Sequence, residues 1–578
     1  MEKFDYFYKK NNNDLLFETF KKNDLTNLQK CQNYIPLYKN FFTLNNSNYN
    51  NINLNNKYTL YDINSKLSNN KYTSNIYSIN DSSKNLIEKN IFIKFSPILD
   101  PLKYMTGKYD TSSNLFDLPK HEENDNLYAK TLDTNNSAYI ESLFTYLSSK
   151  LLHEHNFTNG LDFYGSFLAI KNKFIYNIYE DIEVLNDSDF FHKNKDILFT
   201  IDDSMHEEYV NYDTRNYKKK LELEDTLHEL TLEDISDLSD LDNIFKINNN
   251  NSNENVMNLV FESKTNNLNN SNHTNNSNCS SRSSNTNSGS ENTETEEVEN
   301  SDDCSSENSD NTIDSCNSDD SSYVEDDELY STIEKFPILL IASECCNNTL
   351  DYLLMEDKLS DKELESVILQ VLMILITYQN TFNMTHNDLH TNNIMYVETQ
   401  KQYLYYKING KHYKVPTYGK IYKIIDFGRA IYKFRGELMC SDSYHPDGDA
   451  ATQYNFEPYF NNKKPRLEPN MSFDLCRLGC AMYDLLCDDE EEDEITSPIK
   501  RIILSWCFDD KERNILYKSN GEERYPDFKL YKMIARTVHN HTPHNVLNNE
   551  YFERYIVNRK KINKNTPIIN IDNIPCYV

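Results

Sequence analysis

Apolar residues recur at helical spacing in three parts of the chain and predict three long helices. The first covers 136–152, and a polar residue at its start can cap it. The second covers about 361–380 and is apolar on nearly every face. Ser360 and Glu363, at its start, have capping-box spacing. The third begins near Ser472. The apolar residues of the first and third helices are Ile140, Leu143, Phe144, Leu147, Leu151, Leu475, Leu478, Met482, Leu485 and Leu486.

Apolar and β-branched runs predict the strands. Asn409-Gly410, between YLYYKI and KHYKV, is a strong turn signal and predicts a hairpin. The other predicted strands are 90–95, a strand pair around 161–170, the buried 336–342, and 421–425. We expect 1–90 to form short strands and loops, and 96–135 to be an irregular connection. Strands dominate the first part and helices the second, which predicts an α+β fold class.

One acidic segment changes this picture. The chain has 578 residues and a formal net charge of −32, of which 171–335 alone contributes −27. Within this segment, 249–328 has few aliphatic residues, and that composition predicts disorder. We interpret the segment as a solvated insertion. The alternative is a docking site for a basic partner or a phosphoacceptor site, because three serines directly precede acidic residues. These serines are Ser301, Ser309 and Ser318.

Charge and apolar content also limit the partners. An acidic chain is a poor general binder of nucleic acid, which is held by cationic contacts to phosphate. The most apolar run, 367–376, is interrupted by Gln370 and is shorter than the ~20 residues that span a bilayer. The twelve cysteines include no C-x-x-C pair, so neither a zinc site nor a disulfide framework is predicted. We expect an intracellular, cytoplasmic protein with no membrane partner.

Two short motifs carry the candidate chemistry. The sequence H-N-D-L-H-T-N-N at 386–393 follows the predicted helix at 361–380, and I-D-F-G at 425–428 follows a predicted strand. An H-x-D-L-x-x-x-N loop followed by D-F-G resembles the protein-kinase superfamily. The resemblance implies a bilobal protein-kinase-like fold, transfer of the γ-phosphoryl group of ATP, and Mg²⁺ as a cofactor.

The resemblance implies a role for each polar residue of the two motifs. Asp388 would accept or orient the proton of the attacking hydroxyl, and His390 stands where the family usually has a catalytic Lys. Asn393 and Asp426 are the expected Mg²⁺ ligands, because hard oxygen donors suit this ion. The residues with implied structural roles are His386, Phe427, Gly428 and Asp474.

Three other segments extend the resemblance over about 300 residues. Lys94, in IFIKF, resembles the lysine that pairs with the ATP phosphates, and Glu141 resembles its helical partner on the flank of the 136–152 stripe. Asp474, in FDLCRLG, resembles the aspartate that accepts backbone N–H bonds from the catalytic loop. The sequence LLIASECCNNTLD resembles the last strand of the first lobe and the hinge. In it, Ser343 would be the gatekeeper, and Glu344 and Cys346 would offer backbone groups to adenine.

Several residues differ from the protein-kinase pattern, and these differences leave two other functions open. No Gly precedes Gly107, so the G-x-G-x-x-G phosphate loop is absent, and part of 67–80 would have to replace it. The residue before Asp388 is Asn387, where many kinases have Arg. HNDLH also resembles small-molecule kinases of the aminoglycoside and choline type, although D-F-G and DLCRLG oppose that assignment. The missing glycine loop and the altered lysine position favour a catalytically weak pseudokinase scaffold, but the intact acidic and amide positions oppose it.

We therefore predict four regions and one preferred function. The regions are 1–90 with the first strands, 91–170 with the lysine strand and its partner helix, the acidic insertion 171–335, and a hinge with a helical lobe at 336–578. The segments 441–454 and 521–535, together with the Asn-rich tracts, most resemble serine/threonine kinases of giant DNA viruses of the mimivirus group. That resemblance implies a protein substrate and a place in the host cytoplasm or the virion.

Overall fold

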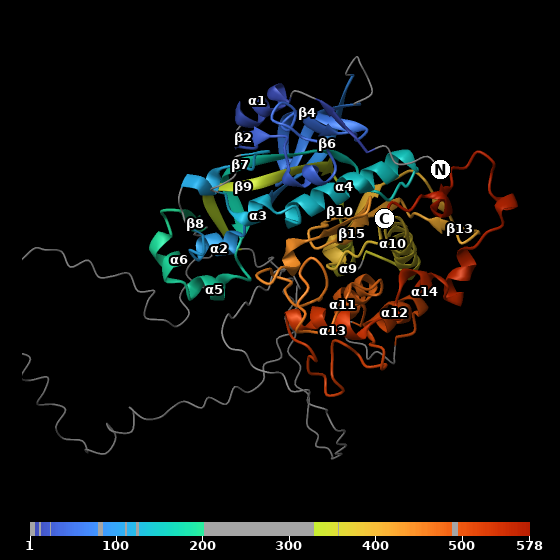
Figure 1. The fold of residues 1–578 in the computed structure, drawn as a ribbon. Coiled ribbons are helices and arrows are strands. Elements are labelled where there is room, and N and C mark those ends of the chain that lie inside the picture. The colour runs from blue at the N-terminus through green and yellow to red at the C-terminus, as the bar shows by residue number, and fades with distance from the viewer. Residues whose placement is uncertain are drawn as a thin grey trace, which may run out of the picture. The chain divides into compact units, whose positions relative to one another are not determined.

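The described part of the chain is mixed α and β. The computed structural model describes residues 6–10, 13–22, 25–78, 85–109, 113–122, 127–201, 329–356, 358–487 and 495–578. All of them belong to one compact unit, and its sheets are mainly antiparallel, as expected for an α+β protein (Figure 1). The segment predicted to be disordered, 249–328, lies outside the described residues, as do the three candidate phosphoacceptor serines within it.

The largest sheet has seven strands and is antiparallel throughout, in the order β2-β7-β9-β6-β5-β4, with β8 also paired to β9. Its strands are β2 (Leu28–Gln32), β4 (Tyr58–Ser68), β5 (Lys71–Ser78), β6 (Leu86–Pro97), β7 (Phe163–Asn177), β8 (Phe199–Ile201) and β9 (Tyr330–Glu344). The register of the central strands places Lys94 of β6 opposite Ile341 of β9. The strands predicted at 90–95 and 336–342 are confirmed. The strand pair predicted around 161–170 is wrong, because the chain passes the bulge at Gly165 without turning.

Helix α4 (Ser137–Glu154) packs on β7 and β9 of this sheet (Figure 1). It begins where the sequence predicts, because the side chain of Asn136 accepts a hydrogen bond from the Ala138 amide. The predicted apolar stripe is buried, from Ile140 to Leu151. Since its apolar face is fixed against the sheet, a residue on the flank of α4 has a defined position relative to β6.

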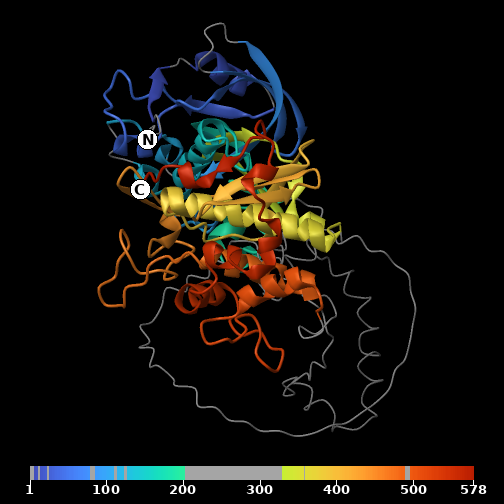
Figure 2. The same ribbon diagram turned by 90° about the vertical axis from the view of Figure 1, so that its right-hand side faces the viewer.

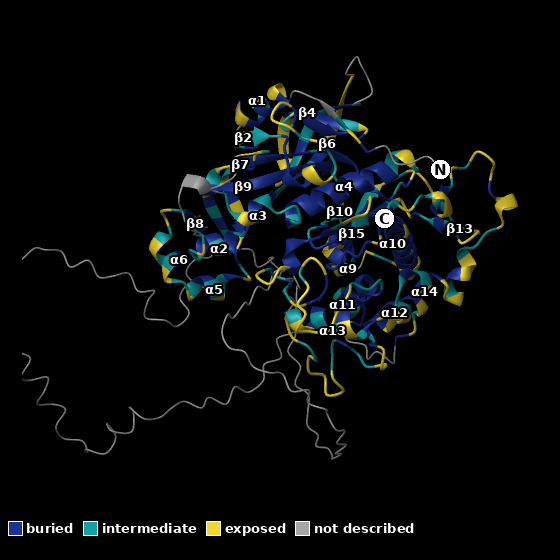
Figure 3. Cartoon of the chain, in the orientation of Figure 1, coloured by how far each residue is buried: buried dark blue, intermediate teal, exposed yellow. Residues whose placement is uncertain are grey.

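Helices dominate the chain after β9. They are α9 (Leu350–Met355), α10 (Asp361–Phe382), α11 (Phe473–Cys487), α12 (Pro498–Leu504), α13 (Phe528–Thr537) and α14 (Pro543–Leu547). The predicted capping box is present at the start of α10, and the helix is buried over most of its length (Figure 3). It contacts β14, α12 and α14. Within the described residues, no helix combines the length and the apolar character that a membrane crossing requires.

Short sheets of two or three strands lie among these helices (Figure 2). Their strands are β10 (Asn348–Thr349), β11 (Ile394–Glu398), β12 (Tyr403–Ile408), β13 (Lys411–Pro416), β14 (Lys420–Ile424), β15 (Ile431–Phe434), β16 (Glu437–Cys440) and β17 (Ile569–Asn570). The predicted Asn409-Gly410 hairpin is confirmed, and both turn residues have positive φ, as this turn type requires. β11 pairs with β14, which brings the ends of the two motif loops together.

Several element boundaries in the structure differ from those predicted from the sequence. A helix, α1 (Asp14–Lys22), lies in the region expected to hold only strands and loops, and α2 (Pro101–Met105) and α3 (Ala129–Leu132) interrupt the expected irregular connection. The main sheet also enters both ends of the predicted insertion 171–335, because β7 runs to Asn177 and β9 begins at Tyr330. The acidic composition of 171–335 as a whole did not reveal the apolar residues at its two ends that face the core. The remaining described elements include β1 (Tyr8–Lys10), β3 (Ile52–Leu54), α5 (Ile182–Asn186) and α6 (Asp189–Asn194).

Candidate functional site

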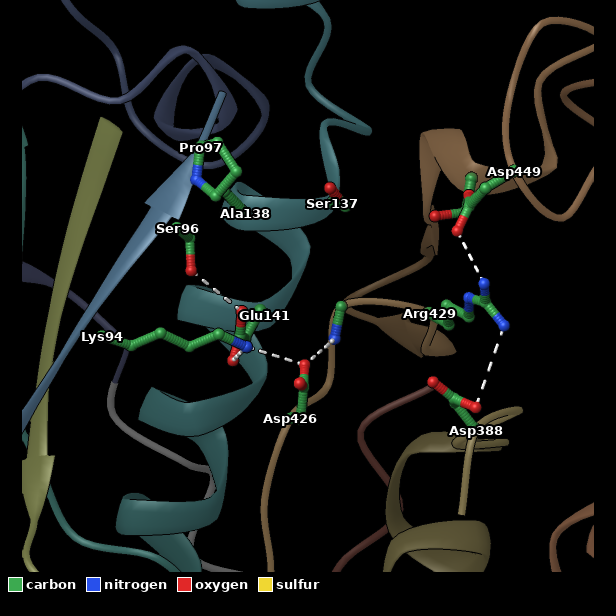
Figure 4. A pocket seen from close by; sticks show the side chains of 12 residues that line it. Lys94, Ser96, Pro97, Ser137, Ala138, Glu141, Asp388, Asp426, Arg429 and Asp449 are labelled. Atoms are coloured by element: carbon green, nitrogen blue, oxygen red, sulfur yellow. Dashed lines mark hydrogen bonds and ion pairs between the residues drawn. The ribbon is translucent and has the colours of Figure 1, made fainter. Parts of the chain in front are cut away.

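Lys94, Glu141 and Asp426 meet in one cavity (Figure 4). The ammonium group of Lys94, on β6, lies 2.7 Å from Oε1 of Glu141 on α4 and 2.8 Å from Oδ1 of Asp426. Burial raises the pKa of Glu141 to about 7, although Lys94 opposes this shift. Burial also lowers the pKa of Lys94, but the two carboxylates outweigh it and hold the pKa above its usual value. The predicted Lys94–Glu141 pair is therefore present, with Lys94 charged.

Asp426 follows β14 in a left-handed backbone conformation, with φ of 60°. Its Oδ1 also accepts a hydrogen bond from the backbone amide of Gly428 at 3.4 Å. A Cβ atom at Gly428 would lie 3.3 Å from the same oxygen, so glycine leaves room for the carboxylate. The side chain of Asp426 is 41% exposed, whereas that of Glu141 is 8% exposed. Asp426 is thus the more open carboxylate of the cluster.

Phe427 connects α4 to the loop that contains Asp388. Its ring is fully buried and lies 4.6 Å from the ring of Phe144 on α4, measured between centroids. On its other side it lies 5.6 Å from the ring of His386. Nε2 of His386 donates to the carbonyl of Ile425, directly before Asp426. This stack fixes the two motif loops to each other and to the helix that carries Glu141.

Asp474 shapes the loop at 386–393 as predicted. Its two carboxylate oxygens accept the backbone N–H groups of His386 at 2.9 Å and Asn387 at 2.8 Å. The carboxylate is fully buried, and burial raises its pKa, against the lowering effect of the two amides. Asn387 has φ of 64°, a conformation that asparagine tolerates better than most residues. Asp474 therefore stabilises a loop conformation that the backbone alone would disfavour.

Replacing Asp474 with Asn is expected to lower the free energy of unfolding by about 1–3 kcal/mol. The amide would present an N–H₂ group to one of two buried backbone N–H donors, which would lose its acceptor. Urea unfolding of the two proteins measures the difference. Asp361→Asn is the matched control, because Asp361 is an exposed carboxylate at the start of another helix. Equal losses in the two variants would contradict a specific role for the buried carboxylate.

Asp388 lines the cavity opposite Lys94, and its carboxylate has partners outside its own loop. Its Oδ1 accepts a hydrogen bond from the hydroxyl of Tyr531 on α13 at 2.9 Å and lies 3.8 Å from Nη1 of Arg429. Arg429 makes a closer ion pair with Asp449, at 2.7 Å. Figure 4 shows Arg429 between Asp388 and Asp449. The two carboxylates together hold the pKa of Arg429 above its usual value, although burial lowers it.

Asn393 and His390 lie in the same loop, around the short 3₁₀ turn at Thr391–Asn393. The amide nitrogen of Asn393 donates to the backbone carbonyl of Asp388 at 2.9 Å and lies 3.1 Å from Nε2 of His390. Burial lowers the pKa of His390 to about 4, so the ring is neutral at pH 7. His390 therefore cannot supply the positive charge of the lysine it replaces. It instead accepts a hydrogen bond from Asn393.

The predicted hinge residues lie at the end of β9, outside the residues that line the cavity. Ser343 is buried and pairs with Phe92 of β6. The backbone amide of Glu344 already donates to the carbonyl of Asp162 at 3.0 Å, so it is not free for adenine. The Glu344 carboxylate accepts from Lys423, an ion pair that the sequence did not predict. Cys346 is buried, and burial raises the pKa of its thiol to about 12.

The segment suggested to replace the glycine loop contains a tight turn. Asn69-Asn70 connects β4 to β5, with Ser68 paired to Lys71. Residues 64–70 are exposed, and φ of Asn70 is 58°. The carbonyl of Asn70 accepts a hydrogen bond from Ile93, the residue before Lys94, at 2.8 Å. This hairpin tip is therefore fixed beside the strand that carries Lys94.

Sequence reasoning did not find Tyr531 or Asp449. Tyr531 is 143 residues from Asp388, and Asp449 is 20 residues from Arg429. A tyrosine in an amphipathic helix and an aspartate beside Gly448 each carry an ordinary local pattern, so no sequence signal distinguishes them. No protein-family model matches this chain, and no curated protein is significantly similar to it.

Proposed function

We propose that this chain is an ATP-dependent protein kinase that transfers the γ-phosphoryl group to Ser or Thr of a protein substrate. The observation that carries the proposal is the convergence of Lys94, Glu141, Asp388 and Asp426 on one cavity. They come from a strand, a helix and two loops that are far apart in sequence. In a bilobal protein-kinase-like fold, the main sheet with α4 would be one lobe and the helices after β9 the other. The acidic segment between β8 and β9 would be an insertion in the first lobe.

The residues present fit a complex of nucleotide with Mg²⁺. Asp426 offers an open carboxylate, and the amide nitrogen of Asn393 is bonded to Asp388, which directs the amide oxygen of Asn393 elsewhere. Mg²⁺ commonly takes one or two protein oxygens together with phosphates and waters, so these two donors are sufficient. Among the described residues, no cluster of three or more His, Cys, Asp or Glu forms a self-contained metal site. Bound Mg²⁺ would neutralise phosphate charge during transfer.

The protein side chains would divide the remaining work. Glu141 would hold Lys94 in place. When ATP binds, its phosphates would compete with the two carboxylates for the ammonium group of Lys94 and pair with it. Asp388 would orient the acceptor hydroxyl and accept its proton as the hydroxyl oxygen bonds to the γ-phosphorus. The bond from that phosphorus to the β–γ bridging oxygen breaks, and ADP leaves. Positioning and charge account for most of such catalysis, and both come from side chains that the fold has already fixed.

Incubation with radiolabelled ATP, Mg²⁺ and a mixed protein substrate tests the proposal. We expect label on protein, and phosphoamino acid analysis should find it on Ser or Thr. Parallel reactions with aminoglycosides, amino-sugars and choline test the small-molecule alternative, and label there instead would overturn the choice of substrate. Binding of Mg·ATP without transfer to any acceptor would indicate a pseudokinase scaffold. The observation that favours this second candidate is His390 itself, which stands where the family usually has a lysine and whose Nε2 accepts a hydrogen bond from the amide of Asn393.

Ser343→Phe is expected to exclude bulky ATP-site ligands while retaining ATP. Ser343 is a small residue paired with Phe92 and Phe163 of the neighbouring strands, and at the proposed gatekeeper position a larger side chain would block the region behind the adenine. Titration of both proteins with ATP and with a bulky purine analogue measures the effect. Ser343→Ala is the control, because it leaves the space open. Equal affinity of the bulky analogue for all three proteins would show that the hinge is assigned wrongly.

A further inference from the structure

A tyrosine from a distant helix holds the carboxylate of Asp388. The hydroxyl of Tyr531, on α13, donates to Oδ1 of Asp388 at 2.9 Å. The same hydroxyl oxygen accepts a hydrogen bond from Nε of Arg477, on α11, also at 2.9 Å. Tyr531 and Asp388 are each 6% exposed, and Arg477 is 1% exposed. A buried guanidinium–hydroxyl–carboxylate chain therefore fixes one oxygen of Asp388.

Packing determines where the Tyr531 hydroxyl lies. The ring of Tyr531 stacks on Phe528 with 5.4 Å between centroids and also contacts the ring of Phe473. The guanidinium groups of Arg429 and Arg477 lie 5.5 Å and 5.2 Å from the centre of the Tyr531 ring. A ring held by two aromatic and two cationic neighbours has little rotational freedom. Its hydroxyl is thus a fixed donor.

The contacts to Asp388 favour one orientation of its carboxylate. Tyr531 and Arg429 both approach Oδ1. Arg429 binds Asp449 more closely, so the Tyr531 hydroxyl is the short contact on Asp388. In Figure 4 the other oxygen of Asp388 points to the side where Asp426 lies. That oxygen is the one available to an acceptor hydroxyl in the cavity.

We infer that Tyr531 is a positioning residue for Asp388 in phosphoryl transfer and that Arg477 orients Tyr531. The inference rests on the proposed function. Without the Tyr531 hydroxyl, Oδ1 of Asp388 would keep only the 3.8 Å contact with Arg429, and the carboxylate could rotate about its Cβ–Cγ bond. Small misplacements of a catalytic group cost large factors in rate, because the reacting atoms must already be aligned. Tyr531 is not among the residues that line the cavity, so it would act on the rate only through Asp388.

Tyr531→Phe tests this role, because it removes one oxygen atom and leaves the packed ring in place. We expect kcat to fall about tenfold or more, as for the loss of a hydrogen bond to a charged group. The KM for ATP should stay within twofold. Tyr406→Phe is the matched control, since it removes a buried hydroxyl that donates to Asn159 at 2.7 Å, outside the cavity. The control should keep the wild-type kcat.

The double variant separates positioning from general destabilisation. In the Asp388→Asn background, Tyr531→Phe should cause no further loss of the residual rate, because the group it positions is already impaired. An equal loss in both backgrounds would overturn the inference, as would an unchanged kcat in the single variant. A raised kcat would identify the contact as inhibitory and also overturn it.

The same proteins distinguish failure of the inference from failure of the proposed function. A wild-type enzyme that transfers phosphate, together with an Asp388→Asn variant that does not, supports the proposed function by itself. In that enzyme, an unaffected Tyr531→Phe variant overturns only the positioning role. A wild-type protein that transfers no phosphate to any acceptor overturns both.

Discussion

Asp388→Asn and Asp426→Ala are each expected to lower phosphoryl transfer by ~10²–10⁴-fold without unfolding the protein. Asparagine at 388 can still accept the hydrogen bond of Tyr531 but cannot accept a proton from the substrate hydroxyl. Alanine at 426 removes both the proposed Mg²⁺ ligand and one of the two carboxylates that hold Lys94. The turnover number with radiolabelled ATP measures both losses.

The two variants should differ in how they bind the nucleotide. Asp426→Ala should weaken binding of Mg·ATP, because it removes the exposed carboxylate that we propose as a ligand of the metal. Asp388→Asn should leave that affinity unchanged, since its role concerns the acceptor hydroxyl. Calorimetric titration with Mg·ATP distinguishes the two variants. Asp187→Asn is the control, because Asp187 is an exposed carboxylate directly after α5. Wild-type turnover in both variants would show that the site is assigned wrongly.

Local patterns predicted the elements that carry this site. The stripe from Ile140 to Leu151 predicted α4, because a helix with one apolar face must pack that face against the sheet. The spacing of Ser360 and Glu363 predicted the start of α10. The hairpin at Asn409-Gly410 followed from the backbone conformations that these residues permit. Each of these signals depends on residues that are close in sequence.

Contacts between distant segments escaped prediction. Asp14–Lys22 forms a helix although the surrounding sequence is rich in Asn, because its apolar face is buried against the sheet. The loss of charge at His390 depends on burial, which the sequence alone does not specify. Tyr531 reaches Asp388 only because α13 packs against α11. The identity of the motif residues could be predicted, but the groups that orient them could not.

The unphosphorylated protein is expected to be fully active, because fixed carboxylates hold the segment after D-F-G. In many protein kinases an Arg before the catalytic Asp binds a phosphate that orders this segment. Here that position is Asn387, which is buried. Its amide nitrogen donates to the carbonyl of Arg429, and its amide oxygen accepts from the hydroxyl of Tyr454. Asn387 therefore joins the segment through neutral hydrogen bonds.

Two acidic residues supply the charge that a phosphate would bring. Asp449 pairs with Arg429, as described above. Asp442 accepts a hydrogen bond at 3.0 Å from the backbone amide of Ser137, the first residue of the helix that carries Glu141, and it pairs with Lys130 on α3. Burial raises the pKa of Asp442, although Lys130 opposes this shift. Both carboxylates belong to the encoded sequence. The segment can therefore be ordered without a modifying enzyme that adds phosphate.

The candidate phosphoacceptors in the segment are mostly inaccessible. Residues 441–454 contain five hydroxyl side chains that could accept phosphate, of which four are buried and only Thr452 is exposed. The buried acceptors are Ser441, Ser443, Tyr444 and Tyr454. A modifying kinase would have to unpack the segment to reach them. Phosphatase treatment of the purified protein should therefore leave the initial rate within twofold. A tenfold drop that rephosphorylation restores, and that a Ser441/Ser443/Thr452→Ala variant lacks, would contradict this expectation.

Asp442→Asn tests directly whether the carboxylates order the segment, and it should lower kcat by tenfold or more. Its loss leaves Lys130 without this carboxylate partner and weakens the contact between the segment and the start of α4, because an amide oxygen accepts the Ser137 N–H less strongly than a carboxylate does. Because the Lys130 side chain is 33% exposed, the cost in stability should be smaller than the ~3–5 kcal/mol typical of breaking a fully buried ion pair. Since α4 carries Glu141, the Lys94–Glu141 pair should loosen with it. Asp447→Asn is the control, because that side chain lies in the same segment and is 82% exposed. If both variants retain the wild-type rate, the segment is ordered by its apolar packing and not by these carboxylates.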